Sequence, residues 1–220
     1  MHILPANQRD LWESLRPLQY RGFVLYGGTA ISLRLGHRVS VDFDFFSDLP
    51  FDHSSLLADL PFAERAQVIQ EAPNTLTLLV SPPSGTGEGV KVSFFGGLAL
   101  GRVEVPESTT DGVLFAASFL DLMGTKLKVI QQRAEKKDYL DIHAMIHSGV
   151  RLDQGLGAAK ALYGRAFQPS EALKALVYFQ DGNLSELPGP IRIELIEASA
   201  SVENVPEMSR ISSQLGIGAV

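Results

Sequence analysis

The chain has 220 residues, of which 45% are hydrophobic and 20% are charged. This composition is typical of a globular chain and excludes a mostly disordered one, and the length suits one sizeable core with a helical addition but not two large domains. Nineteen Lys and Arg against 25 Asp and Glu give a formal net charge of −6, so contact with a nucleic-acid backbone requires a local basic patch.

The chain contains no cysteine, which excludes disulfide bonds and thiolate metal sites. The first residues, MHILPANQRDLWESLRP, lack the charged-then-apolar order of a signal peptide. No stretch approaches the ~18 uninterrupted apolar residues of a membrane span. We therefore expect a protein of the cytoplasm that has no membrane partner.

Hydrophobic periodicity predicts the first elements of the chain. Leu11, Trp12, Leu15 and Leu18 form one apolar stripe of a helix that Pro17 limits. An apolar run then stops at two glycines and gives way to small and apolar residues, and a later segment alternates Asp with Val and Phe. The predicted elements are a helix over 9–18, a buried strand over 23–26, a helix over 29–35 and a strand over 40–46.

The remaining elements predict a mixed α and β domain capped by helices. Gly124 is the point at which the longest helical segment would break. We expect an α/β domain over 1–148 and a helical C-terminal region over 149–220. The predicted elements are a helix over 54–60, strands over 67–71, 75–80, 90–95 and 101–105, a long helical segment over 115–146, helices over 153–163 and 171–179, and an amphipathic tail.

Asp42 and Asp44 are the first candidates for chemistry. Residues two apart on a strand point to the same face, with Cα atoms ~6.5 Å apart at ~3.3 Å rise per residue. Two such carboxylates can hold one or two divalent cations between them. Because the alternating Val and Phe side chains indicate a buried face, an unpaired carboxylate here would cost several kcal/mol, and a cation or a basic partner is required. The alternative is a pair of surface acids on an edge strand.

Gly27, Gly28 and Thr29 lie between a predicted buried strand and a predicted helix. Glycines at such a position let backbone N–H groups approach a ligand, and a helix N-terminus favours an anion. The turn alone is explained equally well as a tight turn that needs glycine. Together with the acidic strand, however, it would place an anion cradle beside a cation site, which is what phosphate chemistry needs. Arg34, about two helical turns later, is expected to reach back to a phosphate or to pair with a buried aspartate.

A second group of charges lies in the long helical segment. At 100° per residue, Lys126, Arg133, Lys137 and Asp141 fall within ~80° of one another on one helical face. This pattern is also that of an ordinary solvated face with i,i+4 pairing. In an acidic protein, a stripe of three cations opposed by aspartates nevertheless suits a triphosphate or an RNA backbone.

The stretch LYGGTAISLR over 25–34, the stretch HRVSVDFDFF over 37–46, and the later Lys126, Arg133 and KDYLDI over 137–142 resemble the AbiEii/AbiGii-type nucleotidyltransferase toxins. The resemblance implies an α+β fold, with a polymerase-beta-like nucleotidyltransferase core of mixed sheet and flanking helices. It also implies a nucleoside triphosphate (NTP) as substrate, two Mg²⁺ ions, transfer of a nucleotide to an acceptor hydroxyl that can be on tRNA, and a role as the toxin of a toxin–antitoxin or abortive-infection system with a cognate antitoxin.

The resemblance also implies roles for individual residues. Asp42 and Asp44 would bind Mg²⁺, Lys126 would meet the triphosphate, and Asp138 or Asp141 would be the supporting carboxylate. The residues expected at the phosphates are Gly27, Gly28, Thr29, Arg34, Ser40, Arg133 and Lys137.

One position departs from the family's pattern. Polymerase-beta-like enzymes place a third carboxylate on a neighbouring strand, where it activates the attacking hydroxyl, but here the corresponding strand has Ser93. Glu104 and Asp138 are the substitutes that the sequence offers. Without one of them, help from a general base is missing and activity is weak or lost.

Three other functions compete with this one. The first is a binding module that keeps the fold after loss of catalysis, which Ser93 supports. The second is transfer to a small molecule such as a sugar or an antibiotic. The third, a haloacid-dehalogenase-type phosphatase, is disfavoured because Phe45 follows Asp44 where Thr or Val is expected.

Overall fold

The computed structural model describes residues 3–85 and 87–217. The chain divides into two compact units: the first comprises the described residues of Met1–Gly101, Val105–Ala117 and Ser212–Val220, and the second comprises Arg102–Glu104 and Ser118–Ile211. This division differs from the expected boundary at 148/149, because the helices that begin after Ser118 pack with the later helices. Residues 212–217 return to the first unit.

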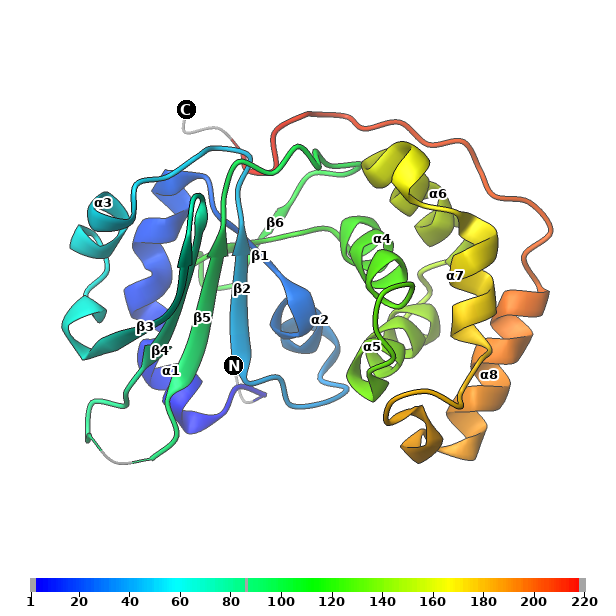
Figure 1. Ribbon diagram of the computed structural model, residues 1–220, viewed down its shortest axis with the longest axis horizontal. Helices are drawn as coiled ribbons and strands as arrows, with labels where there is room; N and C mark the ends of the chain where they lie inside the picture. The colour runs from blue at the N-terminus through cyan, green and yellow to red at the C-terminus, as the bar shows by residue number, and fades with distance from the viewer. Residues whose placement is uncertain (1–2, 86, 218–220) are drawn as a thin grey trace. The chain divides into compact units, whose positions relative to one another are not determined.

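In the described part of the chain, seven strands of the first unit form one mixed sheet, in the order β3-β4-β5-β2-β1-β7-β6 (Figure 1). Strand β2 pairs antiparallel with β1 and parallel with β5, and β1 pairs parallel with β7. The mixed sheet with flanking helices confirms the α+β class. The strands are β1 (Val24–Tyr26), β2 (Asp42–Phe46), β3 (Ala66–Ala72), β4 (Thr75–Val80), β5 (Val90–Phe95), β6 (Glu107–Ser108) and β7 (Phe115–Ala116).

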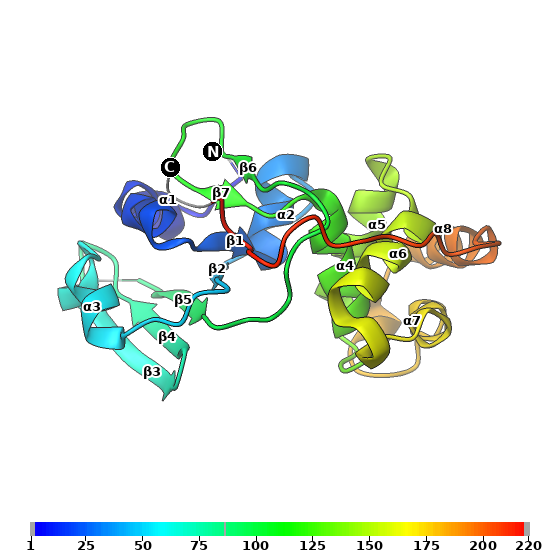
Figure 2. The same cartoon turned by 90° about the horizontal axis from the view of Figure 1, so that it is seen from above.

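Helices cover both faces of this sheet (Figures 1 and 2). On one face, Trp12 packs against Phe43 with ring centroids 6.0 Å apart, and Phe43, Phe45 and Phe94 are fully buried. On the other face lies α2, which begins directly after β1. The helical elements of this unit are α1 (Ala6–Trp12), the 3₁₀ helix η1 (Glu13–Arg21), α2 (Gly27–Leu35), α3 (His53–Ala58) and the 3₁₀ turn η2 (Ala63–Arg65).

Two predictions for this part of the chain need correction. The helix expected over 9–18 consists of α1 and η1, and Pro17 lies inside η1, where its missing N–H leaves one hydrogen bond of the 3₁₀ helix unmade. The prediction of a strand over 101–105 is wrong, since no strand lies among the described residues between β5 and β6. The N–H groups of Val103 and Glu104 donate to the Asp121 carboxylate, at 2.9 and 3.3 Å, and not to a neighbouring strand.

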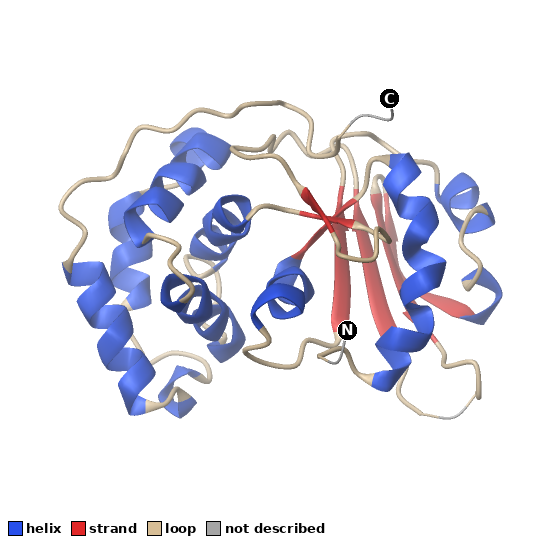
Figure 3. Cartoon of the chain, turned by 180° about the vertical axis from the view of Figure 1, so that it is seen from behind, coloured by secondary structure: helices blue, strands red, loops and turns tan. Residues whose placement is uncertain are grey.

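Helices build the second unit (Figure 3). The long segment expected over 115–146 starts with β7 and continues as two helices, and Gly124 lies inside the first of them. A Cβ at Gly124 would lie 3.0 Å from the backbone nitrogen of Ala159, so this glycine lets α4 and α6 approach closely. The helices are α4 (Phe119–Val129), α5 (Lys136–His147), α6 (Leu152–Tyr163), α7 (Pro169–Leu176) and α8 (Gly189–Ala200), with 3₁₀ turns η3 (Gly164–Ala166) and η4 (Leu184–Glu186).

The hydropathy of these helices bears on membrane insertion. Among the residues that the structure describes, we find no helix with both the length and the apolar character that crossing a bilayer requires.

Candidate active site

The turn between β1 and α2 has room for glycine alone. Gly27 has φ +71°, in the left-handed region, and a Cβ there would overlap Oδ2 of Asp44. A Cβ at Gly28 would lie 2.9 Å from Oγ of Ser40 and would overlap the Arg38 guanidinium. The two glycines therefore allow polar side chains of the following loop and strand to reach the N-terminus of α2.

Thr29 connects the same turn to the acidic strand. Its side chain is buried, and its hydroxyl donates to the backbone carbonyl of Asp42. Gly27, Gly28, Thr29, Ser40 and Asp44 are thus brought together in one place, as the sequence predicts.

Strand β2 presents its two aspartates on one face. Asp42 and Asp44 are partly exposed, whereas the alternating Phe43 and Phe45 are completely buried. The register sets Tyr26 beside Asp44 on one side and Ser93 beside it on the other. Because the alternation is intrinsic to a strand, the predicted common face of the two carboxylates is present.

Asp42 has a basic partner that the sequence reasoning missed. Lys91 on β5 is in register with Asp42, and its Nζ lies 3.0 Å from Oδ2 of Asp42. The exposed fractions of the two side chains are 42% and 30%. Local sequence patterns give no signal for this pair, since only the parallel pairing of β2 with β5 brings the two residues together.

Arg34 lies in the last turn of α2, with 17% of its side chain exposed. Its Nη2 donates to the carbonyl of Ala116 at 3.1 Å and lies 3.7 Å from Oε2 of Glu107. Burial lowers the pKa of the Arg34 guanidinium, and the charge of Glu107 opposes part of this effect. Arg34 thus contacts the strand pair β6–β7 at the opposite side of β1 from β2.

The second predicted group of charges does not form one helical face. Lys126 lies on α4, Arg133 lies between the helices, and Lys137, Asp138 and Asp141 lie on α5. The prediction of a single stripe is wrong because the chain turns after Val129 and starts a new helix at Lys136.

The turn instead creates a buried ion cluster. Nζ of Lys126 lies 2.7 Å from Oδ1 of Asp138 and 2.6 Å from Oδ2 of Asp141. Both carboxylates are fully buried, and 8% of the Lys126 side chain is exposed. Nε of Arg133 donates to Oδ2 of Asp138 at 2.9 Å. We call Lys126, Arg133, Asp138 and Asp141 the buried ion cluster; in it, two basic groups match two carboxylates.

The electrostatics of Asp138 follow from this arrangement. Burial by itself raises the pKa of the Asp138 carboxyl. The charge of Lys126, the hydrogen bonds from Arg133 and Lys126 and the charge of Arg133 outweigh burial and hold the pKa below its usual value.

Lys137 lies outside the buried ion cluster. Its side chain is half exposed, and its Nζ lies 2.9 Å from Oε2 of Glu135.

Neither expected substitute for the third carboxylate stands on the sheet. Glu104 is an exposed side chain in the segment between β5 and β6, and Asp138 is committed to the buried ion cluster. Within residues 3–85 and 87–217, no three His, Asp or Glu side chains gather in a group that could hold a metal ion. Two carboxylates do fit a Mg²⁺ ion that arrives with its nucleotide, because Mg²⁺ is commonly bound by one or two carboxylates together with substrate phosphates.

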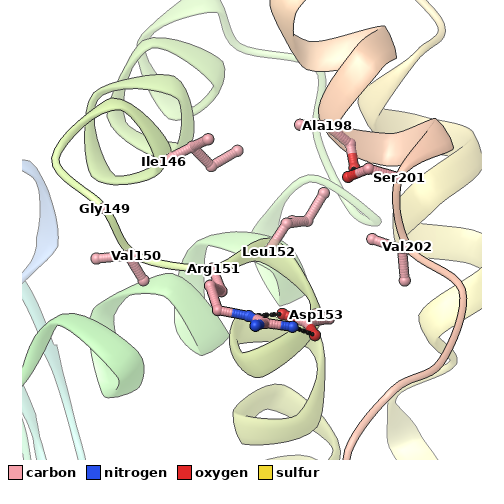
Figure 4. A pocket seen from close by; sticks show the side chains of 9 residues that line it. All are labelled: Ile146, Gly149, Val150, Arg151, Leu152, Asp153, Ala198, Ser201 and Val202. Carbon is pink, nitrogen blue, oxygen red and sulfur yellow. Dashed lines mark hydrogen bonds and ion pairs between the residues drawn. The ribbon is translucent and has the colours of Figure 1, made fainter.

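A cavity of about 420 Å³ lies in the helical unit, between the end of α5, the start of α6 and the end of α8 (Figure 4). Its apolar lining includes Ile146, Leu152 and Val202, and Nε of Arg151 donates to Oδ1 of Asp153 at 3.0 Å beside it. The cavity is lined by none of the residues predicted to carry chemistry.

Comparison with solved structures defines the class of fold. An antigenic nucleotidyltransferase-like protein from Paracoccidioides brasiliensis is similar with a TM-score of 0.55 and 17% identity, over 90% of this chain and 95% of that one. MenT4, a nucleotidyltransferase toxin from Mycobacterium tuberculosis, has a TM-score of 0.48 and 16% identity, over 89% and 94% of the two chains. The first of these similarities shows that the fold is nucleotidyltransferase-like.

Sequence comparison gives the family. The model of the AbiEii family, described as nucleotidyl transferase AbiEii toxin of a Type IV toxin–antitoxin system, matches residues 10–210. An uncharacterized protein of Aquifex aeolicus (strain VF5) is 34% identical over 185 residues, which are 82% of this chain and 85% of that protein. The chain belongs to the AbiEii family of nucleotidyltransferase toxins, and the resemblance inferred from the three motifs is confirmed.

Proposed function

We propose that this chain transfers a nucleotide from an NTP to an acceptor hydroxyl with the help of Mg²⁺, and that the acceptor is an RNA such as tRNA. The observation that carries the proposal is the position of Asp42 and Asp44 on one strand face, with Gly27 so close to Asp44 that no side chain fits between them. Such an arrangement would set two cation ligands directly beside a helix N-terminus that favours an anion.

The proposed roles in the sheet unit follow from these contacts. The backbone N–H groups of Gly27 and Gly28 bind phosphate oxygens, and the buried Thr29 hydroxyl holds the acidic strand against the turn. Ser40 offers a phosphate a hydroxyl close to the turn, since its Oγ would lie 2.9 Å from a Cβ at Gly28. Arg34 adds positive charge to the same helix.

The proposed roles in the helical unit are of two kinds. Arg133 and Lys137 are each about half exposed and are the phosphate-binding candidates of this unit. Lys126 must leave Asp138 or Asp141 before it can meet a triphosphate, since its ammonium lies between their carboxylates. Asp138 and Asp141 then act by positioning Lys126.

In the proposed reaction, the acceptor oxygen forms a bond to the α-phosphorus, the bond from this phosphorus to the bridging β-phosphate oxygen breaks, and pyrophosphate leaves. Mg²⁺ would neutralise charge on the attacking and leaving oxygens. Asp42 and Asp44 orient the reactants, and the hydroxyl proton passes to solvent, because Ser93 cannot accept it. The lack of a positioned base is expected to slow transfer by about 10²–10⁴-fold relative to a site with three carboxylates.

The test supplies the protein with each labelled NTP in turn, together with Mg²⁺ and total cellular RNA. We expect label from one or more NTPs to enter an RNA band with the wild-type protein and not with Asp42→Asn. Circular dichroism of the Asp42→Asn variant should show an unchanged fold. Equal labelling by Asp42→Asn would overturn the assignment of Asp42 to the reaction. Label in a small molecule instead of RNA would show that the acceptor is that small molecule.

A second candidate is a nucleotide-binding module without catalysis. Two observations favour it: Ser93 stands beside Asp44 in place of an acid, and Lys91 is paired with Asp42. Calorimetry separates the two candidates, because NTP binding without incorporation into RNA, protein or a small molecule identifies the module.

Membership of a toxin–antitoxin family leads us to propose a cognate antitoxin as partner. Expression of the wild-type chain should arrest bacterial growth, and expression of Asp42→Asn should not. Co-expression of a neighbouring small open reading frame that restores growth would identify the antitoxin.

A further inference from the structure

Lys91 is a charged residue in the candidate site for which the proposed reaction has no role. Parallel pairing of β2 with β5 puts it directly opposite Asp42, and its ammonium is 3.0 Å from the carboxylate. On its other side, β4 brings Leu79 into register, which offers no charge. The carboxylate of Asp42 is therefore the charged group that the sheet presents to Lys91.

This ion pair conflicts with a role of Asp42 as a cation ligand. An ammonium at hydrogen-bond distance from the carboxylate repels a divalent cation that approaches the same oxygens, and it already neutralises the charge that would attract the cation. A cation can bind fully at Asp42 and Asp44 only after the ammonium of Lys91 has moved away. With 42% of its side chain exposed, Lys91 has the freedom to move.

A bound nucleotide would supply the reason for this movement. Its triphosphate carries several negative charges, and the glycine turn that is proposed to bind it touches Asp44, two residues from Asp42 on the same strand face. A lysine ammonium binds phosphate oxygens as a compact point charge. Phosphates in this position therefore compete with Asp42 for Lys91.

We infer that Lys91 is a positioning residue that makes cation binding at Asp42 and Asp44 depend on a bound nucleotide. The inference rests on the proposed function of the same site. Without nucleotide, Lys91 occupies the carboxylate of Asp42 and cations bind weakly. With nucleotide, Lys91 pairs with phosphate and releases Asp42. By thermodynamic linkage, the cation must strengthen nucleotide binding by the same factor.

The test measures Mn²⁺ affinity by electron paramagnetic resonance, a readout that needs no turnover. Mn²⁺ is titrated alone and then with a non-hydrolysable α,β-methylene analogue of ATP, CTP, GTP or UTP, each in turn. The proteins are the wild type, Lys91→Gln and Lys91→Arg. The matched control is Lys174→Gln, which removes a lysine that pairs with Glu171 on the surface of α7, at 2.9 Å.

For Lys91→Gln we expect Mn²⁺ alone to bind about tenfold more tightly than to the wild type, because a competing positive charge is gone. The strengthening of Mn²⁺ binding by the analogue should shrink by a similar factor. Lys91→Arg should retain most of the wild-type coupling, and Lys174→Gln should retain all of it. Unchanged or weaker Mn²⁺ binding by Lys91→Gln would overturn the inference.

A double variant, Asp42→Asn with Asp44→Asn, separates failure of this inference from failure of the proposed function. If the wild type binds Mn²⁺ with an analogue and the double variant does not, the proposed site holds, and the Lys91 variants decide the inference alone. If the double variant binds Mn²⁺ as the wild type does, the proposed cation site is wrong and the inference falls with it. Thermal unfolding in EDTA should show that each variant is folded.

Discussion

The sheet unit and the helical unit both contain two aspartates with a lysine, but the environments of these charges are opposite. Asp42, with 30% of its side chain exposed, pairs with the 42%-exposed Lys91 across two strands. Asp138 and Asp141 have no exposed surface, and both contact Lys126.

This difference separates two uses of the same residue types. Charges that keep part of their hydration can exchange partners at little cost, so a cation or a phosphate can displace the pair of Asp42 with Lys91. Buried charges have lost their hydration and rely on one another, so that removal of one partner leaves the others uncompensated. We therefore expect substitutions in the first group to leave stability nearly unchanged and substitutions in the second group to lower it.

The largest effect is expected for Lys126→Met in the buried ion cluster. This change leaves two buried carboxylates with Arg133 as their remaining basic neighbour in the cluster, and it should lower the free energy of unfolding by about 3–5 kcal/mol. Urea denaturation measures the change, and Lys160→Met, at an exposed position of α6, is the control. Under the same conditions Asp42→Asn should change the free energy of unfolding by no more than about 1 kcal/mol. Similar losses of unfolding free energy in Lys126→Met and Asp42→Asn would contradict the difference drawn between the two groups of charges.

A smaller effect on stability is expected for Gly27→Ala, which tests the glycine turn beside Asp44. Its φ of +71° disfavours alanine by about 1–2 kcal/mol, and the new methyl group would also overlap Asp44. The control is Gly36→Ala, which has φ +62° and no atom near its Cβ. Gly27→Ala should lose more stability in urea than Gly36→Ala because of the overlap with Asp44, and calorimetry should show loss of NTP binding for Gly27→Ala alone. Normal NTP binding by Gly27→Ala would remove the turn from the site.

The smallest effect is expected in the pH dependence of stability. Since the pKa of Asp138 is lower in the folded protein than in the unfolded chain, its contribution to stability is present above the unfolded value of ~3.9 and is lost as the pH falls through the folded value. Urea midpoints are measured at about eight pH values between about pH 6 and pH 2.5. As the pH is lowered, the midpoint of Asp138→Asn should therefore fall less steeply than that of the wild type. Parallel curves would show that Asp138 does not contribute.

Local patterns in the sequence predicted most strands of the sheet and the common face of Asp42 and Asp44. The period-two alternation of Asp with Phe fixes which side chains of β2 share a face, and this property needs no knowledge of the neighbouring strands. The two glycines before α2 likewise mark a turn by their own conformational freedom. The AbiEii family and the α+β class were predicted correctly from the resemblance of these segments together with the later Lys126, Arg133 and residues 137–142.

The features that the sequence did not reveal depend on contacts between distant segments. The position of Lys91 opposite Asp42 requires the parallel register of β2 with β5. The buried ion cluster requires the turn between α4 and α5, which contains neither Gly nor Pro and is therefore invisible to a search for helix breakers. The strand expected over 101–105 failed because the Asp121 side chain takes the backbone donors that a neighbouring strand would have needed.

The return of the chain to the sheet unit has a mechanical consequence. The N–H of Leu215 donates to Oδ1 of Asp48 at 2.8 Å, so the tail after Ile211 is anchored in the same unit as α1 and β1. A pull exerted between α1 and residues 212–217 would load this anchorage first. The helices between Ser118 and Ile211 would bear tension only after the tail had detached.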